Sequence, residues 1–256
     1  MSATPTCPTI LLLQGAFQLP EVYEKLTVAL KAQGFPVVHP SLPSLCGQDE
    51  PDFGSKSLTA DADVAQAALR RLVEDENRFV LVLMHSYGGL VGTEAVPEDL
   101  GQKSRRSRGL QGGVIHLFFF TAFILAEGQS VAGSFGESPN NGIRAGGRSY
   151  MKNPARTMYS DLPEDEAEHW AAKTIDQSLG VQGTPLTRAA YRYVPSTYVV
   201  CENDQAVPPQ VQEMFGNNAG AALLRLDSGH SPMLSKTDEL AGMITDVAHQ
   251  AVGQSL

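Results

Sequence analysis

Short apolar runs bounded by Gly, Pro and polar residues recur along the chain. They are TILLL (9–13), PVVHP (36–40), FVLVLM (79–84), VIHLFFF (114–120), TYVVC (197–201) and ALLRL (222–226). Most are continuously apolar, which is typical of strands covered on both faces. The pattern therefore predicts about six strands in a buried, mainly parallel sheet.

Helical patterns lie between these runs. Residues 20–33 begin with Pro20, place apolar side chains on one face and stop before Gly34, and residues 58–74 carry a second apolar stripe. A last helix is expected at about 236–250. Strand and helix in alternation predict right-handed crossovers and a doubly wound sheet.

The alternation fails between residues 125 and 195. Clusters of Gly, Pro, Asn and Ser separate weak helical patterns there, such as PEDEAEHWAAKTI (163–175). The prediction is an α/β fold with a doubly wound, mainly parallel sheet and a mainly helical cap. Residues 1–124 and 196–256 would form the core, and residues 125–195 the cap insertion.

Composition narrows the class of protein. With 256 residues, 42% hydrophobic and 18% charged, the chain can bury a sizeable core. The net charge of −9 repels polyanions, so no nucleic-acid partner is expected. The basic run KSRRSR (103–108) contains no aromatic residue and is expected to be a solvated loop.

Targeting and metal signals are weak. The three cysteines, Cys7, Cys46 and Cys201, fit no disulfide or metal-binding spacing and are expected to be free thiols. The apolar run at 9–13 is too short for a signal peptide or a membrane span, so we expect a cytoplasmic protein without a membrane partner. Because no His, Asp and Glu cluster has ligand spacing, no metal or other cofactor is expected.

Three polar signals follow predicted strands, at the sheet edge where parallel α/β proteins gather function. Ser86 follows FVLVLM, Asp204 follows TYVVC and His230 follows ALLRL. A serine hydroxyl becomes a good nucleophile when an imidazole takes its proton, and a carboxylate fixes that imidazole. The order Ser, acid, His therefore predicts a nucleophile on a strand-to-helix turn, with His230 as general base and Asp204 as its carboxylate partner.

Other residues compete for these roles. Glu202 and Asp227 are alternative acids, and Asp227 is more typical of a turn-forming carboxylate. The alternative to a nucleophile at position 86 is an ordinary turn serine. Among the other histidines, His116 is expected to be a hydrogen-bonded core residue and His85 to face away from Ser86; the remaining three are His39, His169 and His249.

An oxyanion hole requires two N–H donors. The amide of Tyr87, directly after the serine, is one candidate, and Ala16 in the LLLQGAFQ loop is the second. Met84 stands two residues before Ser86, where nucleophile turns usually carry Gly. Either this flexible side chain bends aside or the turn is slightly open.

Together, LLLQGAF, HPSLPS, LMHSYGG, CENDQAVPPQ and DSGHSPMLS resemble the small α/β-hydrolases related to plant methylesterases and hydroxynitrile lyases. The resemblance is closer still to fungal and bacterial hydrolases, many encoded beside natural-product pathways. It implies a six-stranded core, a helical cap, a triad on Ser86, Asp204 and His230, and oxyanion donors on Ala16 and Tyr87. Two positions depart from the relatives: Gln14, where His is frequent, and Met84.

Apolar side chains of the cap region and the first loop are expected to line a substrate pocket. They are Phe17, Phe135, Tyr150, Met151, Met158, Tyr159 and Trp170, and the alternative is that they form the core of the cap. The predicted function is hydrolysis of a small hydrophobic ester or lactone by a cofactor-free monomer or homodimer. The rivals are a C–C lyase or cyclase of a natural-product pathway on the same scaffold, and a small-ligand receptor.

Overall fold

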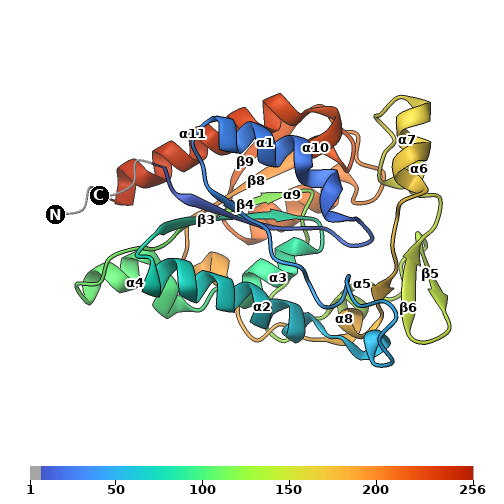
Figure 1. The fold of residues 1–256 in the computed structure, drawn as a ribbon, viewed down its shortest axis with the longest axis horizontal. Coiled ribbons are helices and arrows are strands. Elements are labelled where there is room, and N and C mark those ends of the chain that lie inside the picture. The colour runs from blue at the N-terminus through green and yellow to red at the C-terminus, as the bar shows by residue number, and fades with distance from the viewer. Residues whose placement is uncertain (1–6, 256) are drawn as a thin grey trace.

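A parallel sheet lies between two layers of helices in the computed structural model, which describes residues 7–255 (Figure 1). Its strands are β1 (Thr9–Leu13), β2 (Val37–Val38), β3 (Phe79–His85), β4 (Gly113–Phe120), β8 (Ser196–Cys201) and β9 (Ala222–Leu226), in the order β2-β1-β3-β4-β8-β9. Every neighbouring pair is parallel. The predicted doubly wound α/β sheet is thereby confirmed.

Both faces of the sheet are buried. The helices α1 (Glu24–Ala32) and α11 (Thr237–Ser255) cover one face, and α2 (Leu58–Arg70), α3 (Gly88–Ala95) and α9 (Pro209–Asn218) cover the other (Figure 1). Successive side chains of β1 alternate between the two layers, with Ile10 and Leu12 packed toward α1 and α11, and Leu11 and Leu13 toward α2 and α3. Two-sided burial explains why the strands are continuously apolar.

Several elements differ from the sequence prediction. The pattern over 20–33 divides into a 3₁₀ turn η1 (Pro20–Tyr23) and α1, and the last helix runs further than expected, to Ser255. The remaining short elements of the core are η2 (Phe53–Ser55), the π-helical turn η3 (Arg71–Asp75), η4 (Glu98–Leu100), α4 (Gln102–Ser107) and α10 (Pro232–Ser235).

The basic run at 103–108 was predicted to be a solvated loop. Four of its six residues are exposed, as expected, but the prediction of a loop is wrong. Most of it lies in α4, where Arg105 is 5% exposed. Its guanidinium donates hydrogen bonds to the carbonyl oxygens of Gln111 and Val73, which stabilise a buried charge.

Most of the region predicted to be the cap gathers at one end of the sheet (Figure 1), whereas its last turn, at residues 190–192, lies near the start of β8, beside Gln102 and Ser255. It contains α5 (Val131–Phe135), α6 (Pro154–Thr157), α7 (Glu164–Ala171), α8 (Gly180–Gly183) and η5 (Ala190–Arg192), together with an antiparallel sheet of β5 (Asn141–Arg144), β6 (Arg148–Met151) and β7 (Gln177–Ser178). The sequence did not predict this second sheet. The domain boundaries remain a prediction, and residues 1–6 and 256 of the predicted core lie outside the described residues.

Within residues 7–255, no helix combines the length and apolarity needed to cross a membrane. In the same part of the chain, no group of three or more His, Cys, Asp or Glu side chains is arranged to hold a metal ion. The three cysteines are free thiols, as predicted.

Candidate active site

Ser86 occupies a strained turn between β3 and α3. Its φ of +50° is rare for a residue with a side chain. The turn is held because the Ser86 carbonyl accepts hydrogen bonds from the N–H groups of Gly89 and Phe123, both at 3.0 Å. Gly88 is required next to the turn, since a Cβ atom there would lie 2.2 Å from the Leu13 carbonyl oxygen.

Met84 does not open this turn. The side chain is fully buried, and it occupies space that α3 leaves free at Gly92. A Cβ atom at Gly92 would lie 2.2 Å from Met84 Sδ. The larger residue before the serine is thus accommodated by a glycine one turn into the following helix.

Ser86, His230 and Asp204 form one hydrogen-bonded chain. His230 Nε2 lies 3.1 Å from Ser86 Oγ, and His230 Nδ1 lies 2.8 Å from Asp204 Oδ2. All three side chains are at least nine-tenths buried. Because a carboxylate accepts, Nδ1 carries the proton and Nε2 is left to accept the proton of the serine hydroxyl.

The two rival acids lie elsewhere. The Glu202 carboxylate is exposed and forms an ion pair with Arg225 at 3.3 Å. Asp227 is also exposed and accepts a hydrogen bond from Asn203 Nδ2 at 2.6 Å. Neither has His230 as a hydrogen-bond partner, whereas Asp204 does.

The two candidate oxyanion donors belong to residues at the cavity of the serine. Ala16 and Tyr87 line it beside Ser86 and His230. Among the hydrogen bonds of residues 7–255, neither of their N–H groups is a donor. The Ala16 loop is closed by Gln14, whose Nε2 donates to the Gln18 carbonyl oxygen at 2.7 Å.

A buried network below the triad was missed at the sequence level. His85 Nε2 lies 2.9 Å from the His230 carbonyl oxygen, and His85 Nδ1 lies 2.7 Å from Tyr23 Oη. Tyr23 Oη also accepts the N–H of Gly15 at 2.7 Å. Burial, with His230 nearby, lowers the pKa of His85 well below its usual value, so the ring is neutral, with its proton on Nε2. The network joins the backbone of the predicted base to the loop of the predicted oxyanion donor.

Asp61 is a second missed residue. It lies on the buried face of α2, where it accepts hydrogen bonds from Tyr87 Oη at 2.6 Å and from the backbone N–H and Oγ of Ser44 at 2.8 and 2.5 Å. Burial raises the pKa of the Asp61 carboxyl, although these hydrogen bonds act in the opposite direction. The sequence feature that could have identified Asp61 is its position on the otherwise apolar stripe of this helix.

A cavity of about 280 Å³ opens above the triad. Four of the seven predicted substrate-binding residues line it: Phe17, Phe135, Met151 and Met158. Further apolar side chains complete the walls, namely Leu90, Phe123, Val131, Val181, Val207 and Val211. The site therefore combines a serine that is hydrogen-bonded to a histidine with a mainly apolar cavity that can hold a ligand.

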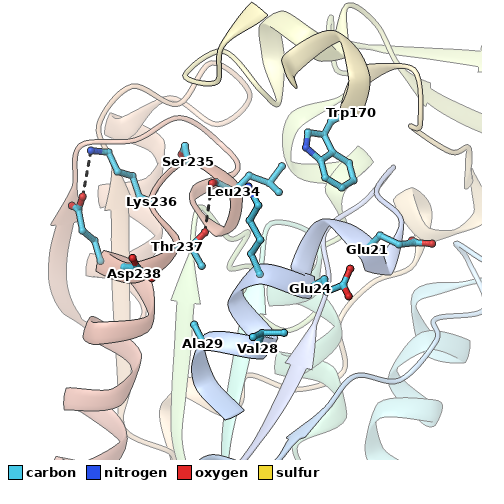
Figure 2. A pocket seen from close by; sticks show the side chains of 12 residues that line it. Glu21, Glu24, Val28, Ala29, Trp170, Leu234, Ser235, Lys236, Thr237 and Asp238 are labelled. Atoms are coloured by element: carbon cyan, nitrogen blue, oxygen red, sulfur yellow. Dashed lines mark hydrogen bonds and ion pairs between the residues drawn. The ribbon is translucent and has the colours of Figure 1, made fainter. Parts of the chain in front are cut away.

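The other three predicted residues do not line this cavity. The Tyr150 ring lies 4.2 Å below the guanidinium of Arg144, and Tyr159 is packed in the core with its hydroxyl near Gln18. Trp170 points into a separate surface groove, which it shares with Val28 of α1 and with Leu234 (Figure 2). The fold of the cap, rather than the residue type, decides which aromatic side chains reach the triad.

Comparison with known proteins identifies relatives of the whole chain. A family model described as the alpha/beta hydrolase family matches residues 10–243. The alpha/beta hydrolase nvfD of Aspergillus novofumigatus is 28% identical over 253 residues, which cover 96% of this chain and 98% of that protein.

Two solved structures show the same fold. A pyrethroid hydrolase from Sphingobium faniae superposes with a TM-score of 0.68 at 20% identity, covering 94% of this chain and 97% of its own. A methylesterase from Arabidopsis gives a TM-score of 0.69 at 18% identity and covers 94% and 98%. At these identities the likeness establishes the architecture alone.

Proposed function

This chain belongs to the alpha/beta hydrolase family, and from that membership we propose that it hydrolyses a carboxylic ester or lactone of a small hydrophobic substrate. Family membership supports a hydrolase, and the ester specificity is our proposal. The observation that carries it is the hydrogen-bonded chain from Ser86 through His230 to Asp204, which opens into an apolar cavity. The names of the structural neighbours, a methylesterase and a pyrethroid hydrolase, agree with an ester substrate.

In the proposed first step, Ser86 Oγ attacks the ester carbonyl carbon while His230 Nε2 takes the hydroxyl proton. Asp204 stabilises the resulting imidazolium and keeps it oriented. The negative oxygen of the tetrahedral intermediate accepts hydrogen bonds from the N–H groups of Ala16 and Tyr87, which have no other acceptor among the described residues.

The second step releases the alcohol. His230 returns the proton to the leaving oxygen as the carbonyl re-forms, which leaves the acyl group on Ser86. A water molecule then gives its proton to His230 and attacks the acyl-enzyme, and collapse of the second intermediate restores the serine hydroxyl and frees the acid. No metal or cofactor takes part in these proposed steps.

A fluorophosphonate probe tests the proposal, with the labelled residue located by peptide mass spectrometry. We expect an adduct on Ser86 that is absent in His230→Ala, because the probe reacts with an activated serine. Turnover of esters or lactones from a library should fall by roughly 10⁴-fold or more in Ser86→Ala and in His230→Ala. Both variants are checked for native circular dichroism.

The rivals predict other results. A lyase or cyclase would consume its substrate without net addition of water, which mass spectrometry of the products detects. A receptor would bind a hydrophobic ligand tightly without turnover. A folded wild-type protein that neither labels at Ser86 nor hydrolyses any ester would contradict the proposal.

A further inference from the structure

The cavity contains one buried amide with an unused acceptor. Gln177 of β7 lines the same cavity as Ser86 and His230, although it is only 3% exposed. Its Nε2 donates to Ser44 Oγ at 3.4 Å, and its Oε1 accepts no hydrogen bond from residues 7–255. The oxygen is not among the fully buried atoms that lack a partner, so it stays accessible from the cavity that Gln177 lines. A donating group of a ligand in the cavity can therefore pair with it.

The hydrogen bonds of Ser44 fix the orientation of the Gln177 amide. The Ser44 hydroxyl has one proton, which it donates to Asp61 Oδ2 at 2.5 Å. Ser44 Oγ can therefore only accept from Gln177, so the amide nitrogen must face Ser44. The Gln177 oxygen is consequently held on the other side of the amide group.

The same hydrogen bonds tie Gln177 to the serine turn. Asp61 also accepts from Tyr87 Oη, and the Ser44 carbonyl oxygen accepts the N–H of Ser178, the residue after Gln177. The cap strand and the turn of the predicted nucleophile are thus joined through one buried carboxylate. An acceptor that is fixed before the ligand arrives loses little entropy on binding.

The charges of the side chains that line the cavity disfavour anionic ligands. None of the described residues that line the cavity is Lys or Arg, and Glu137 is its one carboxylate. A carboxylate on the substrate would lose its hydration without meeting a cation, so anionic substrates are disfavoured.

We infer that Gln177 is a specificity-determining residue that selects hydrophobic esters carrying an uncharged hydrogen-bond donor, a hydroxyl or an N–H group, at the cap side of the cavity. This inference rests on the proposed ester hydrolysis and narrows its substrate class. A methyl ether in place of the hydroxyl keeps the oxygen but removes the donor, and would leave Gln177 Oε1 unpaired.

Two series of esters test the inference. Methyl phenylpropanoates vary the acyl side and benzyl acetates vary the alcohol side, and each ring carries para hydrogen, hydroxyl, methoxy or carboxylate. In at least one series, wild-type kcat/KM for the hydroxyl ester should exceed that for the methoxy ester by about three- to tenfold, the effect of one neutral hydrogen bond. The carboxylate ester should be the poorest substrate of its series.

Three variants separate the role of Gln177 from general damage to the cavity. Gln177→Met keeps the length of the side chain and should bring the hydroxyl-to-methoxy ratio close to one. Ser44→Ala lies outside the cavity lining and should also lower the ratio, because the amide is then free to turn. Gln182→Met is the matched control, and the ratio should persist. Gln182 lines the same cavity and donates to Ser149 Oγ, but it is only partly buried, and within residues 7–255 no carboxylate fixes that serine as Asp61 fixes Ser44.

Binding to Ser86→Ala, measured by calorimetry with the same esters, makes the two proposals distinguishable. Wild-type hydrolysis without hydroxyl preference in either series, or a preference that survives in Gln177→Met, overturns the role of Gln177 and leaves ester hydrolysis intact. If wild type hydrolyses no ester, the proposed function fails. In that case the binding data decide on the donor preference. The preference is supported if Ser86→Ala binds the hydroxyl ester more tightly than the methoxy ester and this difference is lost in the double variant with Gln177→Met. Equal binding of the two esters overturns it.

Discussion

At the scale of single residues, Asp204 shows how one carboxylate sets the state of the histidine. Its Oδ1 accepts the N–H groups of Ala206 and Val207 at 2.7 and 2.9 Å. Its Oδ2 accepts from His230 Nδ1 at 2.8 Å and from Gln212 Nε2 at 3.0 Å. Every partner donates, so the site requires two acceptor oxygens.

Asp204→Asn should therefore reduce kcat by roughly 10⁴-fold. The two backbone N–H groups hold the remaining amide oxygen at the Oδ1 position, so the new NH₂ group faces His230. The imidazole must then accept at Nδ1 and carry its proton on Nε2, where it cannot take the proton of Ser86. Steady-state kinetics with the best ester measures the loss, and thermal unfolding shows whether the fold persists.

Glu202→Gln is the matched control, because Glu202 pairs with Arg225 on the surface and should retain turnover close to wild type. Near-normal kcat in Asp204→Asn, combined with a large loss in Glu202→Gln, would transfer the role of the acid to Glu202.

At the scale of secondary-structure elements, the nucleophile turn depends on how closely β3 and α3 approach. The contact at Gly88 is with the backbone of β1, whereas the contact at Gly92 is with the flexible end of Met84. Only the second contact can be relieved by changing a side chain. The pair Met84 and Gly92 is thus a local adaptation that keeps the turn closed.

Gly92→Ala should destabilise the protein by about 1–3 kcal/mol through overpacking against Met84, less the roughly 1 kcal/mol by which Ala favours a helix. In a Met84→Ala background the contacts with Met84 are gone, and the one remaining close atom is Leu13 Cδ1 at 3.1 Å, the end of a side chain that can move into the space left by Met84. The same substitution should then stabilise the protein. A double-mutant cycle of urea unfolding free energies measures this change of sign.

Gly88→Ala provides the contrast, because its Cβ would meet the Leu13 backbone and Met84→Ala offers no relief. If Gly92→Ala had the same effect with and without Met84, the proposed fit between the two residues would be refuted.

At the scale of the whole molecule, the strands of the main sheet could be predicted from the sequence because they are buried on both faces. A continuously apolar run such as FVLVLM is compatible with few environments besides a covered strand, so the sheet and the three polar strand ends could be placed. The strands of the cap are different. NGIR and RSYM are short and largely polar, and they pair through backbone hydrogen bonds that local patterns do not reveal.

Roles set by the packing of the cap were therefore not predictable from local patterns. Gln177 looks like an ordinary loop glutamine until Ser44 and Asp61 are brought beside it. Trp170 looks like a pocket residue until α7 turns it toward α1. The structure brings together Ser86, Asp204 and His230, which were chosen by chemical type and position at a strand end. Three of the seven residues chosen for the pocket, Tyr150, Tyr159 and Trp170, lie away from the cavity.

The free energy of unfolding of the whole molecule should also depend on pH in the acid range. Burial lowers the pKa of His116, which contacts Thr197 Oγ1 at 2.9 Å, from 6.5 to about 4. Burial lowers the pKa of His39 to about 4 as well. Between pH 6.5 and 4 the unfolded chain binds these protons and the folded protein does not, so the free energy of unfolding should fall as the pH falls through this window.

His116→Gln tests this account, because Gln can still hydrogen-bond Thr197 but takes up no proton. Each such histidine contributes a slope of about 1.4 kcal/mol per pH unit, so the variant should lose stability less steeply than wild type between pH 6.5 and 4 by up to that amount. Urea unfolding across this range gives both slopes, and above pH 7, where the imidazole is neutral in both states, the two curves should run parallel. Equal slopes below pH 6.5 would mean that His116 takes up its proton in the folded protein as readily as in the unfolded chain.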